Sequence, residues 1–140
     1  MTQNVLVALD LEHDALTGKL LSIASEIANL RGAGLELVTV IEATPVEAAT
    51  FLPPEFEKSA RKMAAETLAK LAAKLALRAG KATCSVRFGS IYREILAQAE
   101  QSKTNLIVIG CHTPGVGDFL LGSNAARVVR HAACSVYVVR

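Results

Sequence analysis

The feature of this sequence that most constrains its fold is a series of five short apolar segments separated by stretches of helical length. The segments are Asn4–Leu9, Leu35–Ile41, Thr83–Phe88, Asn105–Ile109 and Ser135–Val139. In the first of them the apolar residues run continuously, which is typical of a strand covered on both faces. Strands joined by connections of helical length predict an α/β fold, with a parallel sheet between two layers of helices.

Four helices are predicted from apolar residues that recur at spacings of three and four. They are expected over Ala15–Arg31, Glu57–Arg78, Ile91–Gln101 and Ala125–Ala132. Asp14 is the expected N-cap of the first helix, and Gly32 marks its end. The apolar stripes that should face the sheet are Leu16, Leu20, Ile23, Ile27 and Leu30 in the first helix, and Met63, Leu68, Leu71, Leu75 and Leu77 in the second.

The remaining features of the chain concern its loops and its class. Residues 43–55 contain three prolines and predict an irregular loop, which is either a lid over a ligand or an ordinary surface loop. The length of 140 residues predicts one domain, and 51% hydrophobic with 20% charged residues excludes a disordered chain. A net charge of +2 and an aromatic content of 4% argue against a nucleic-acid partner.

The cysteines and the first residues bear on the cellular compartment. Cys84, Cys111 and Cys134 have no metal-site spacing and are odd in number, so we expect small core residues in a reducing environment. The chain starts without the pattern of a signal peptide, and no apolar run approaches the roughly 20 residues that span a bilayer. We therefore expect a cytoplasmic protein without a membrane partner.

The segment after the fourth strand is the strongest candidate for a binding site. In an open parallel sheet, ligands bind beyond the carboxyl ends of the strands, and Gly110–Asn124 follows such an end with the sequence GCHTPGVGDFLLGSN. Glycines allow close backbone approach, and the start of the next helix favours an anion such as phosphate. An ordinary glycine-containing connection explains the same residues equally well, and no P-loop motif is present.

The spacing of this segment resembles the signature of the universal stress protein family, which is Gly, two residues, Gly, nine residues, then Gly-Ser or Gly-Thr. Gly110 matches the first glycine, and Gly122 with Ser123 matches the last pair. Thr113 stands at the second glycine, and the spacer is eight residues long. The stretches CHTP at 111–114 and LLGSNAA at 120–126 resemble the F/G branch of this family, whose members bind ATP.

This resemblance implies a single domain over residues 1–140 with a Rossmann-like fold similar to adenine nucleotide alpha hydrolases. Its parallel sheet would have the strand order 3-2-1-4-5. The ligand would be ATP, or AMP or ADP, with or without Mg²⁺. The implied nucleotide-binding residues are Ala8, Leu9, Asp10, Val40, Ile109, Gly110, His112, Thr113, Gly122, Ser123 and Asn124.

The resemblance also implies roles for these residues. Ala8 and Leu9 would line the adenine pocket, Asp10 would bind the ribose or base side, and the backbone of Val40 would meet the adenine edge. Residues 122–124 would hold the phosphates at the start of the last helix.

No catalytic residues and no metal ligands are expected from the residue pattern. Cys111 and His112 are adjacent, and neighbours on an extended segment point to opposite sides. A nucleotide-binding stress or regulatory module is therefore favoured, and a slow ATP hydrolase and a nucleotide-free dimeric module are the alternatives. The last strand, Ser135–Val139, lies at a sheet edge and has neither charge nor proline, which predicts a homodimer paired through it.

Overall fold

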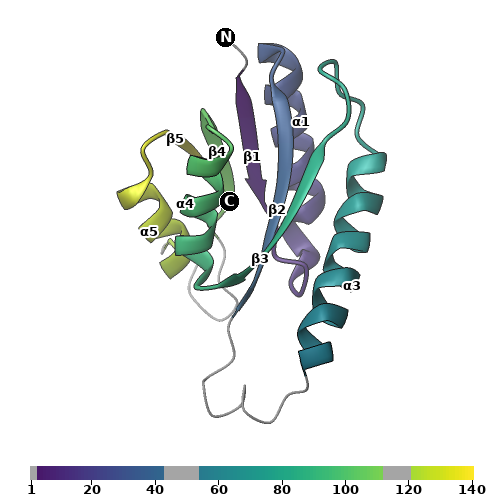
Figure 1. Ribbon diagram of the computed structural model, residues 1–140. Helices are drawn as coiled ribbons and strands as arrows, with labels where there is room; N and C mark the ends of the chain where they lie inside the picture. Colours follow the sequence, from purple (N-terminus) through teal and green to yellow (C-terminus); the bar gives the residue numbers. More distant parts are fainter. Residues whose placement is uncertain (1–2, 43–53, 112–120) are drawn as a thin grey trace.

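The structure is a computed structural model that describes residues 3–42, 54–111 and 121–140. Its elements in chain order are β1 (Asn4–Ala8), a 3-10 turn η1 (Asp14–Leu16), α1 (Thr17–Arg31), β2 (Gly34–Glu42), α3 (Pro54–Ala73), β3 (Thr83–Gly89), α4 (Ile91–Gln101), β4 (Leu106–Gly110), α5 (Ser123–His131) and β5 (Ser135–Val139). The strands form one sheet in the order β3-β2-β1-β4-β5, and every neighbouring pair is parallel (Figure 1). The predicted fold class and strand order are confirmed.

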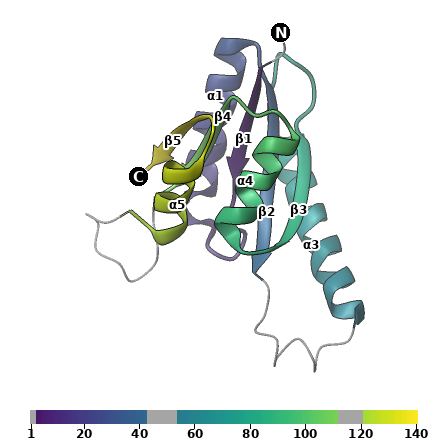
Figure 2. The same ribbon diagram turned by 60° about the vertical axis from the view of Figure 1, so that its left-hand side comes forward.

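Helices cover both faces of the sheet, with α1 and α3 on one side and α4 and α5 on the other (Figure 2). The central strand β1 contributes side chains to both apolar cores, because successive side chains of a strand point to opposite faces of the sheet. Val5 and Val7 pack with α1, whereas Leu6 and Ala8 pack with α4 and α5. This two-sided burial is the reason why the first apolar segment is continuous.

The start of α1 differs from the prediction. The helix begins at Thr17 and not at Ala15, because the chain first makes the 3-10 turn that contains Asp14. Leu16 is the N-cap residue and makes no side-chain cap bond, so the prediction of Asp14 as the cap is wrong. Gly32 ends the helix in the left-handed conformation (φ 64°), as predicted.

Leu30 was expected on the buried stripe of α1, but its side chain is 85% exposed. The buried stripe runs through Ala24 and Ala28 instead. Leu30 follows Ala28 by two residues, which is a rotation of about 200° around the helix axis. The small alanines let α1 lie close to the sheet and turn Leu30 toward solvent.

The helix α3 spans Pro54–Ala73 and not Glu57–Arg78. A proline is well placed at the first helical position, because the N–H that it lacks would have no partner there. Two hydrogen bonds between residues three apart, from the N–H groups of residues 74 and 75, follow the end of the helix. Leu68 is fully buried, but Met63 is 69% exposed, so its assignment to the apolar stripe is wrong.

The other differences are small. The ends of the strands and of α5 lie within two residues of the predicted bounds. The predicted loop and lid over residues 43–55 lie, from 43 to 53, outside the described residues.

Of the three cysteines only Cys111 is buried, because Cys84 lies on the edge strand β3 and Cys134 precedes the edge strand β5. The described helices include none with the length and apolarity that a bilayer span requires.

Candidate functional site

The carboxyl ends of β1, β2 and β4 lie side by side, because β1 is flanked by the other two strands. The end of β1 is locked to β2 by two hydrogen bonds. The N–H of Leu9 donates to the carbonyl of Val38 at 2.8 Å, and the buried hydroxyl of Thr39 donates to the carbonyl of Leu9 at 2.8 Å. The chain therefore leaves the sheet at Asp10 in a defined direction.

The end of β4 is connected to the start of α5 by a hydrogen bond. The N–H of Gly122 donates to the carbonyl of Cys111 at 2.9 Å, and the N–H of Cys111 donates to the carbonyl of Val139 in β5 at 2.9 Å. These bonds bring together the two ends of the segment 112–121. The first turn of α5 consequently begins next to the carboxyl end of β4.

The start of α5 has the properties of an anion-binding end. Its first backbone bond inside the helix runs from the N–H of Ala126 to the carbonyl of Gly122 at 2.9 Å. The N–H groups of Ser123, Asn124 and Ala125 precede this bond and have no acceptor within the helix. Gly122 is the N-cap residue and has no side chain that could cap them. These donors and the positive end of the helix dipole favour a negatively charged group.

Three of the predicted site residues lie on the same face of the sheet. Ala8, Val40 and Ile109 belong to the apolar cluster under α4 and α5, together with Ala125 from the first turn of α5. Leu9 lies on the opposite face, in the cluster under α1. Ala8 and Leu9 therefore contribute to different sides of the sheet, as the alternation of strand side chains requires.

Gly110 has a packing role that its sequence context did not reveal. A Cβ atom at this position would lie 3.1 Å from Leu16 Cδ1 and 3.7 Å from Leu20 Cδ1. The missing side chain thus allows the start of α1 to pack against the end of β4. This requirement exists with or without a ligand.

Asp10 lies at the edge of the site with 61% of its side chain exposed. One carboxylate oxygen accepts a hydrogen bond from the N–H of Glu12 at 3.0 Å, and the other lies 3.1 Å from Nδ1 of His13. Sequence reasoning did not connect His13 with Asp10, although the spacing of three residues after a strand end was a usable signal. His112 and Thr113 lie outside the described residues.

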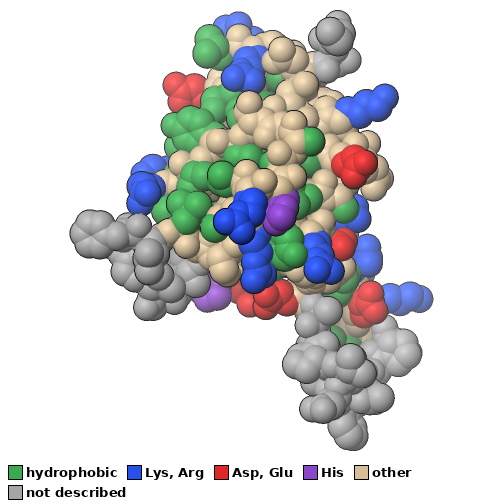
Figure 3. Space-filling view, turned by 90° about the vertical axis from the view of Figure 1, so that its left-hand side faces the viewer, with side chains coloured by type: hydrophobic (Ala, Val, Ile, Leu, Met, Phe, Trp, Pro, Cys, Tyr) green, Lys and Arg blue, Asp and Glu red, His purple; other side chains and the backbone are tan. Residues whose placement is uncertain are grey.

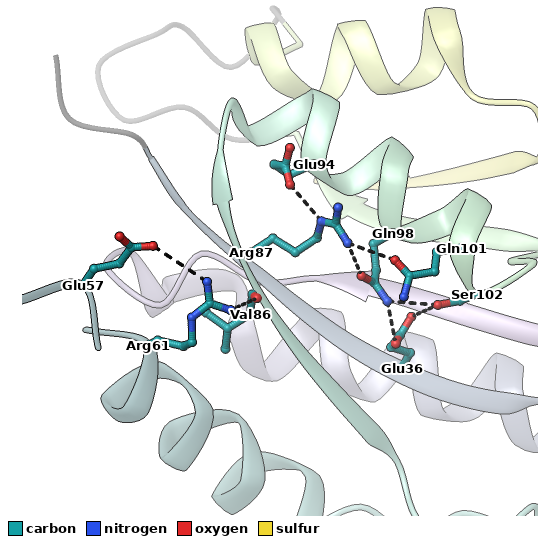
Figure 4. Close-up of polar contacts among 9 residues, drawn as sticks. All are labelled: Glu36, Glu57, Arg61, Val86, Arg87, Glu94, Gln98, Gln101 and Ser102. Carbon is teal, nitrogen blue, oxygen red and sulfur yellow. Dashed lines mark hydrogen bonds and ion pairs between the residues drawn. The ribbon is translucent and has the colours of Figure 1, made fainter. Parts of the chain in front are cut away.

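A second polar cluster lies at the amino end of the sheet, where a cavity of about 200 Å³ is lined by Asn4, Gly34, Leu35, Glu36, Lys81, Thr83 and Ser102. The hydroxyl of Ser102 and the amide of Gln98 donate to the Glu36 carboxylate at 2.7 and 3.0 Å (Figure 4). The hydroxyl of Ser85 donates to the same carboxylate at 3.0 Å. A carboxylate with three donors is satisfied by the protein itself. Within the described ranges, no three His, Cys, Asp or Glu side chains gather as a metal site would require.

Comparison with known proteins identifies the family to which this fold and this site belong. A sequence model described as "Universal stress protein family" matches residues 1–140. The chain belongs to the universal stress protein family. Universal stress protein G of Escherichia coli O157:H7 is 36% identical over 85 residues, which are 61% of this chain and 60% of the relative's length. This relative has the G-type name that the resemblance to the F/G branch predicts.

Two further comparisons cover nearly the whole chain. A putative universal stress protein of Staphylococcus haemolyticus is 31% identical over 143 aligned residues, which cover 99% of this chain and 84% of the relative. The solved structure of the universal stress protein UspA from Lactobacillus plantarum has a TM-score of 0.82 at 24% identity, with 99% of this chain and 97% of that chain covered. The fold is thus that of the family.

Two solved members of the family were described with bound nucleotides. One is a universal stress protein in complex with cAMP, with a TM-score of 0.67 and 22% identity over 99% of this chain and 97% of that chain. The other is the universal stress protein from Archaeoglobus fulgidus in complex with dAMP, with a TM-score of 0.58 and 22% identity over 99% and 98%. At this identity they share the fold with this chain.

Proposed function

We propose that this universal stress protein is a regulatory module that binds an adenine nucleotide beyond the carboxyl ends of β1, β2 and β4. The observation that carries the proposal is the hydrogen bond from Gly122 to Cys111, because it brings the N–H groups of α5 that have no acceptor within the helix to the end of β4. A phosphate needs such donors, and an adenine ring needs an apolar surface nearby. Ala8, Val40 and Ile109 form an apolar surface on the same face as α5.

In this proposal different residues of the site bind the phosphates, the ribose and the adenine of the nucleotide. The N–H groups and side chains of Ser123 and Asn124 bind the phosphates, with Gly122 allowing close approach. Asp10 accepts from the ribose hydroxyls, since a carboxylate has acceptor capacity beyond its two present bonds. Val40 contributes its backbone to the adenine edge. Leu9 supports this edge from the other face, because both its N–H and its carbonyl are already bonded.

The ligands of the two solved relatives support the class of nucleotide. Both cAMP and dAMP contain adenine and a single phosphate. We propose ATP as the ligand, and AMP and ADP are the competing choices that the experiment below separates. If Mg²⁺ takes part, it enters with the phosphates, as magnesium commonly does at nucleotide sites. The residues at this edge fit such a ligand through the donors of α5 and the carboxylate of Asp10.

A slow ATP hydrolase is the second candidate function, and the Asp10–His13 pair favours it. A histidine held by a carboxylate can accept a proton from water. Both side chains are more than half exposed, however, and water-filled surroundings weaken such catalysis. Turnover of ATP with and without Mg²⁺ by the parent protein and by His13→Ala tests this candidate. A rate that His13→Ala abolishes would favour the hydrolase over the purely regulatory module.

The nucleotide itself is tested by mass spectrometry of the denatured, purified protein and by calorimetry with ATP, ADP and AMP. Gly122→Val should weaken binding by about tenfold or more, because its branched side chain would stand where the phosphates approach. Gly18→Val is the matched control, since a Cβ at this exposed glycine meets no atom within 4 Å. Equal affinities for both variants, or no binding of any of the three nucleotides, would reject the proposal and leave a nucleotide-free module.

We also propose that the protein forms a homodimer through β5. This strand lies at the edge of the sheet, and its sequence Ser135–Val139 contains no charged residue and no proline. Unpaired backbone groups on such an edge favour pairing with a second strand. Two copies of β5 related by a twofold axis would satisfy each other's groups in an antiparallel arrangement.

A further inference from the structure

The outer surface of α4 and α5 carries a cluster of cations around one tyrosine. The guanidinium of Arg127 in α5 lies 5.1 Å from the ring centroid of Tyr92 in α4, and that of Arg93 lies 5.7 Å from it. Arg93 Nε also donates to the Tyr92 hydroxyl at 3.0 Å. The ring of His131 lies 6.3 Å from the same aromatic ring. Two helices that are distant in the sequence thus present their basic groups at one place.

Arg130 extends this cluster along α5. It follows Arg127 by three residues, so the two side chains are neighbours on the helix surface, and both are exposed. Figure 3 shows this face, where basic side chains (blue) gather beside a histidine (purple) near the centre of the view. We call Tyr92, Arg93, Arg127, Arg130 and His131 the basic patch.

The arginines of the basic patch have no acidic partner within the described part of the chain. Among residues 3–42, 54–111 and 121–140, the ion pairs are Asp10–His13, Glu57–Arg61 and Glu94–Arg87. Arg93, Arg127 and Arg130 take part in none of them. The hydrogen bond from Arg93 lowers the pKa of the Tyr92 phenol, and the charges of Arg93 and Arg127 lower it further.

Helix stability alone does not account for these positions. A helix dipole favours cations in the last turn, and this explains Arg130 and His131 in α5. Arg93 is in the first turn of α4, where the dipole disfavours a cation. Arg127 lies in the middle of α5 and is held over Tyr92. The guanidinium groups of Arg93 and Arg127 therefore lie beside the Tyr92 ring at positions that the helix dipoles do not explain.

We propose that the basic patch is a docking surface for an acidic segment of a partner protein. Guanidinium groups bind carboxylates in paired hydrogen bonds, and cations held by the Tyr92 ring lose less conformational entropy on binding. Glu100 is exposed and follows Arg93 by seven residues, which is about two helical turns, so an acidic residue occupies the same side of α4 and interrupts any long row of cations along this helix. A nucleic acid needs such a row to neutralise successive phosphates, so a short acidic peptide fits the patch better.

Fluorescence anisotropy tests this inference with a labelled peptide of glutamates interrupted by phenylalanines, and with a peptide in which glutamine replaces each glutamate. The parent protein should bind the glutamate peptide at least about tenfold more tightly than the glutamine peptide. Arg127→Glu combined with Arg130→Glu should remove this preference. Arg127→Gln combined with Arg130→Gln should reduce it, without placing acidic groups near the end of α5.

The matched control is Lys58→Glu combined with Lys62→Glu, which makes the same change of net charge on exposed residues of α3. This variant should keep the preference, and circular dichroism should show equal helix content for all variants. Equal loss of binding in the α3 and α5 variants would overturn the proposal, because net charge alone would then explain it. Tighter binding of a uridine oligonucleotide than of the glutamate peptide would overturn it as well.

Discussion

The two edge strands of the sheet differ in how their outer sides are protected. On β3, the carbonyl of Val86 accepts a hydrogen bond at 3.4 Å from Arg61 of α3 (Figure 4). The guanidinium of Arg61 also lies 4.8 Å from the ring centroid of Phe88. The strand β5 contains only Ser, Val and Tyr, and 45% of Tyr137 is exposed. Arg140 follows β5, and its carbonyl accepts a hydrogen bond from Lys19 of α1 at 2.6 Å.

Charge is also built into β3 itself. Arg87 lies within the strand and donates to Glu94 at 2.9 Å and to Gln98 at 2.7 Å, both in α4. Edge strands with charged residues and a covering helix resist pairing with other chains, whereas uncharged edges favour it. We therefore expect a second copy of this protein to pair with β5 and not with β3.

The largest expected effect is the loss of the proposed dimer in Val138→Pro. The carbonyl of Val139 points toward the neighbouring chain of β4, because it accepts from the N–H of Cys111 directly after that strand, and backbone groups alternate in direction along a strand. The N–H of Val138 therefore points to the free edge, where proline removes the donor but not the pairing with β4. Light scattering should show the mass of a dimer for the parent protein and of a monomer for the variant.

Val138→Thr is the control for this experiment, because it keeps the backbone N–H and nearly the same side-chain shape. It should remain a dimer. A folded Val138→Pro variant with the parent's mass would place the interface elsewhere.

The next largest effect concerns the charge within β3. Arg87→Met removes the bonds to Glu94 and Gln98 and leaves a carboxylate of which only about a quarter is exposed without its partner. We expect the free energy of unfolding to fall by about 1–2 kcal/mol in a urea titration. Tyr137→Phe on β5 should change it by less than about 0.5 kcal/mol. Equal losses of unfolding free energy in Arg87→Met and Tyr137→Phe would contradict the inference that charged side chains stabilise β3 but not β5.

A smaller effect is expected for Arg61→Ala, which uncovers the carbonyl of Val86. The ion pair between Arg61 and Glu57 is exposed and contributes little, so the free energy of unfolding should fall by less than about 1 kcal/mol. In a chain that also carries Val138→Pro, the change should restore association that depends on protein concentration, now through β3. Analytical ultracentrifugation measures this, and a persistent monomer would show that α3 protects β3 without Arg61.

The smallest effect compares the two thiols near the edges. Partial desolvation of its thiol raises the pKa of Cys84 in β3, and the charge of Glu36 raises it further. For Cys134 before β5, partial desolvation is the main cause of the raised pKa. In Glu36→Gln the pKa of Cys84 should fall, so more thiolate is present at a given mildly alkaline pH. Peptide mass spectrometry should show faster alkylation of Cys84 and an unchanged rate for Cys134. Equal changes at both thiols would exclude Glu36 as the cause.

Local sequence patterns were sufficient for the five strands, for the α/β class with its parallel sheet and for the burial of the first strand on both faces, whereas the strand order followed from the resemblance to the family. The run from Val5 to Ala8 is apolar because it packs on both faces of the sheet, and its continuous apolarity predicted this two-sided burial. The glycine-rich segment after β4 likewise indicated the family, and it lies next to the site that we propose. Such features depend on residues close together in the chain, and a sequence displays them directly.

Contacts between distant residues were decided only by the tertiary structure. Gly110 is required by Leu16 and Leu20 of α1, and the basic patch forms because Arg127 crosses to Tyr92 from another helix. Leu30 and Met63 had the right spacing for the core but are exposed, because α1 turns the stripe with Ala24 and Ala28 to the sheet and α3 turns Leu68 to it. Periodicity predicts which residues can share a face of a helix, and only the packing of whole elements determines which of them that face buries.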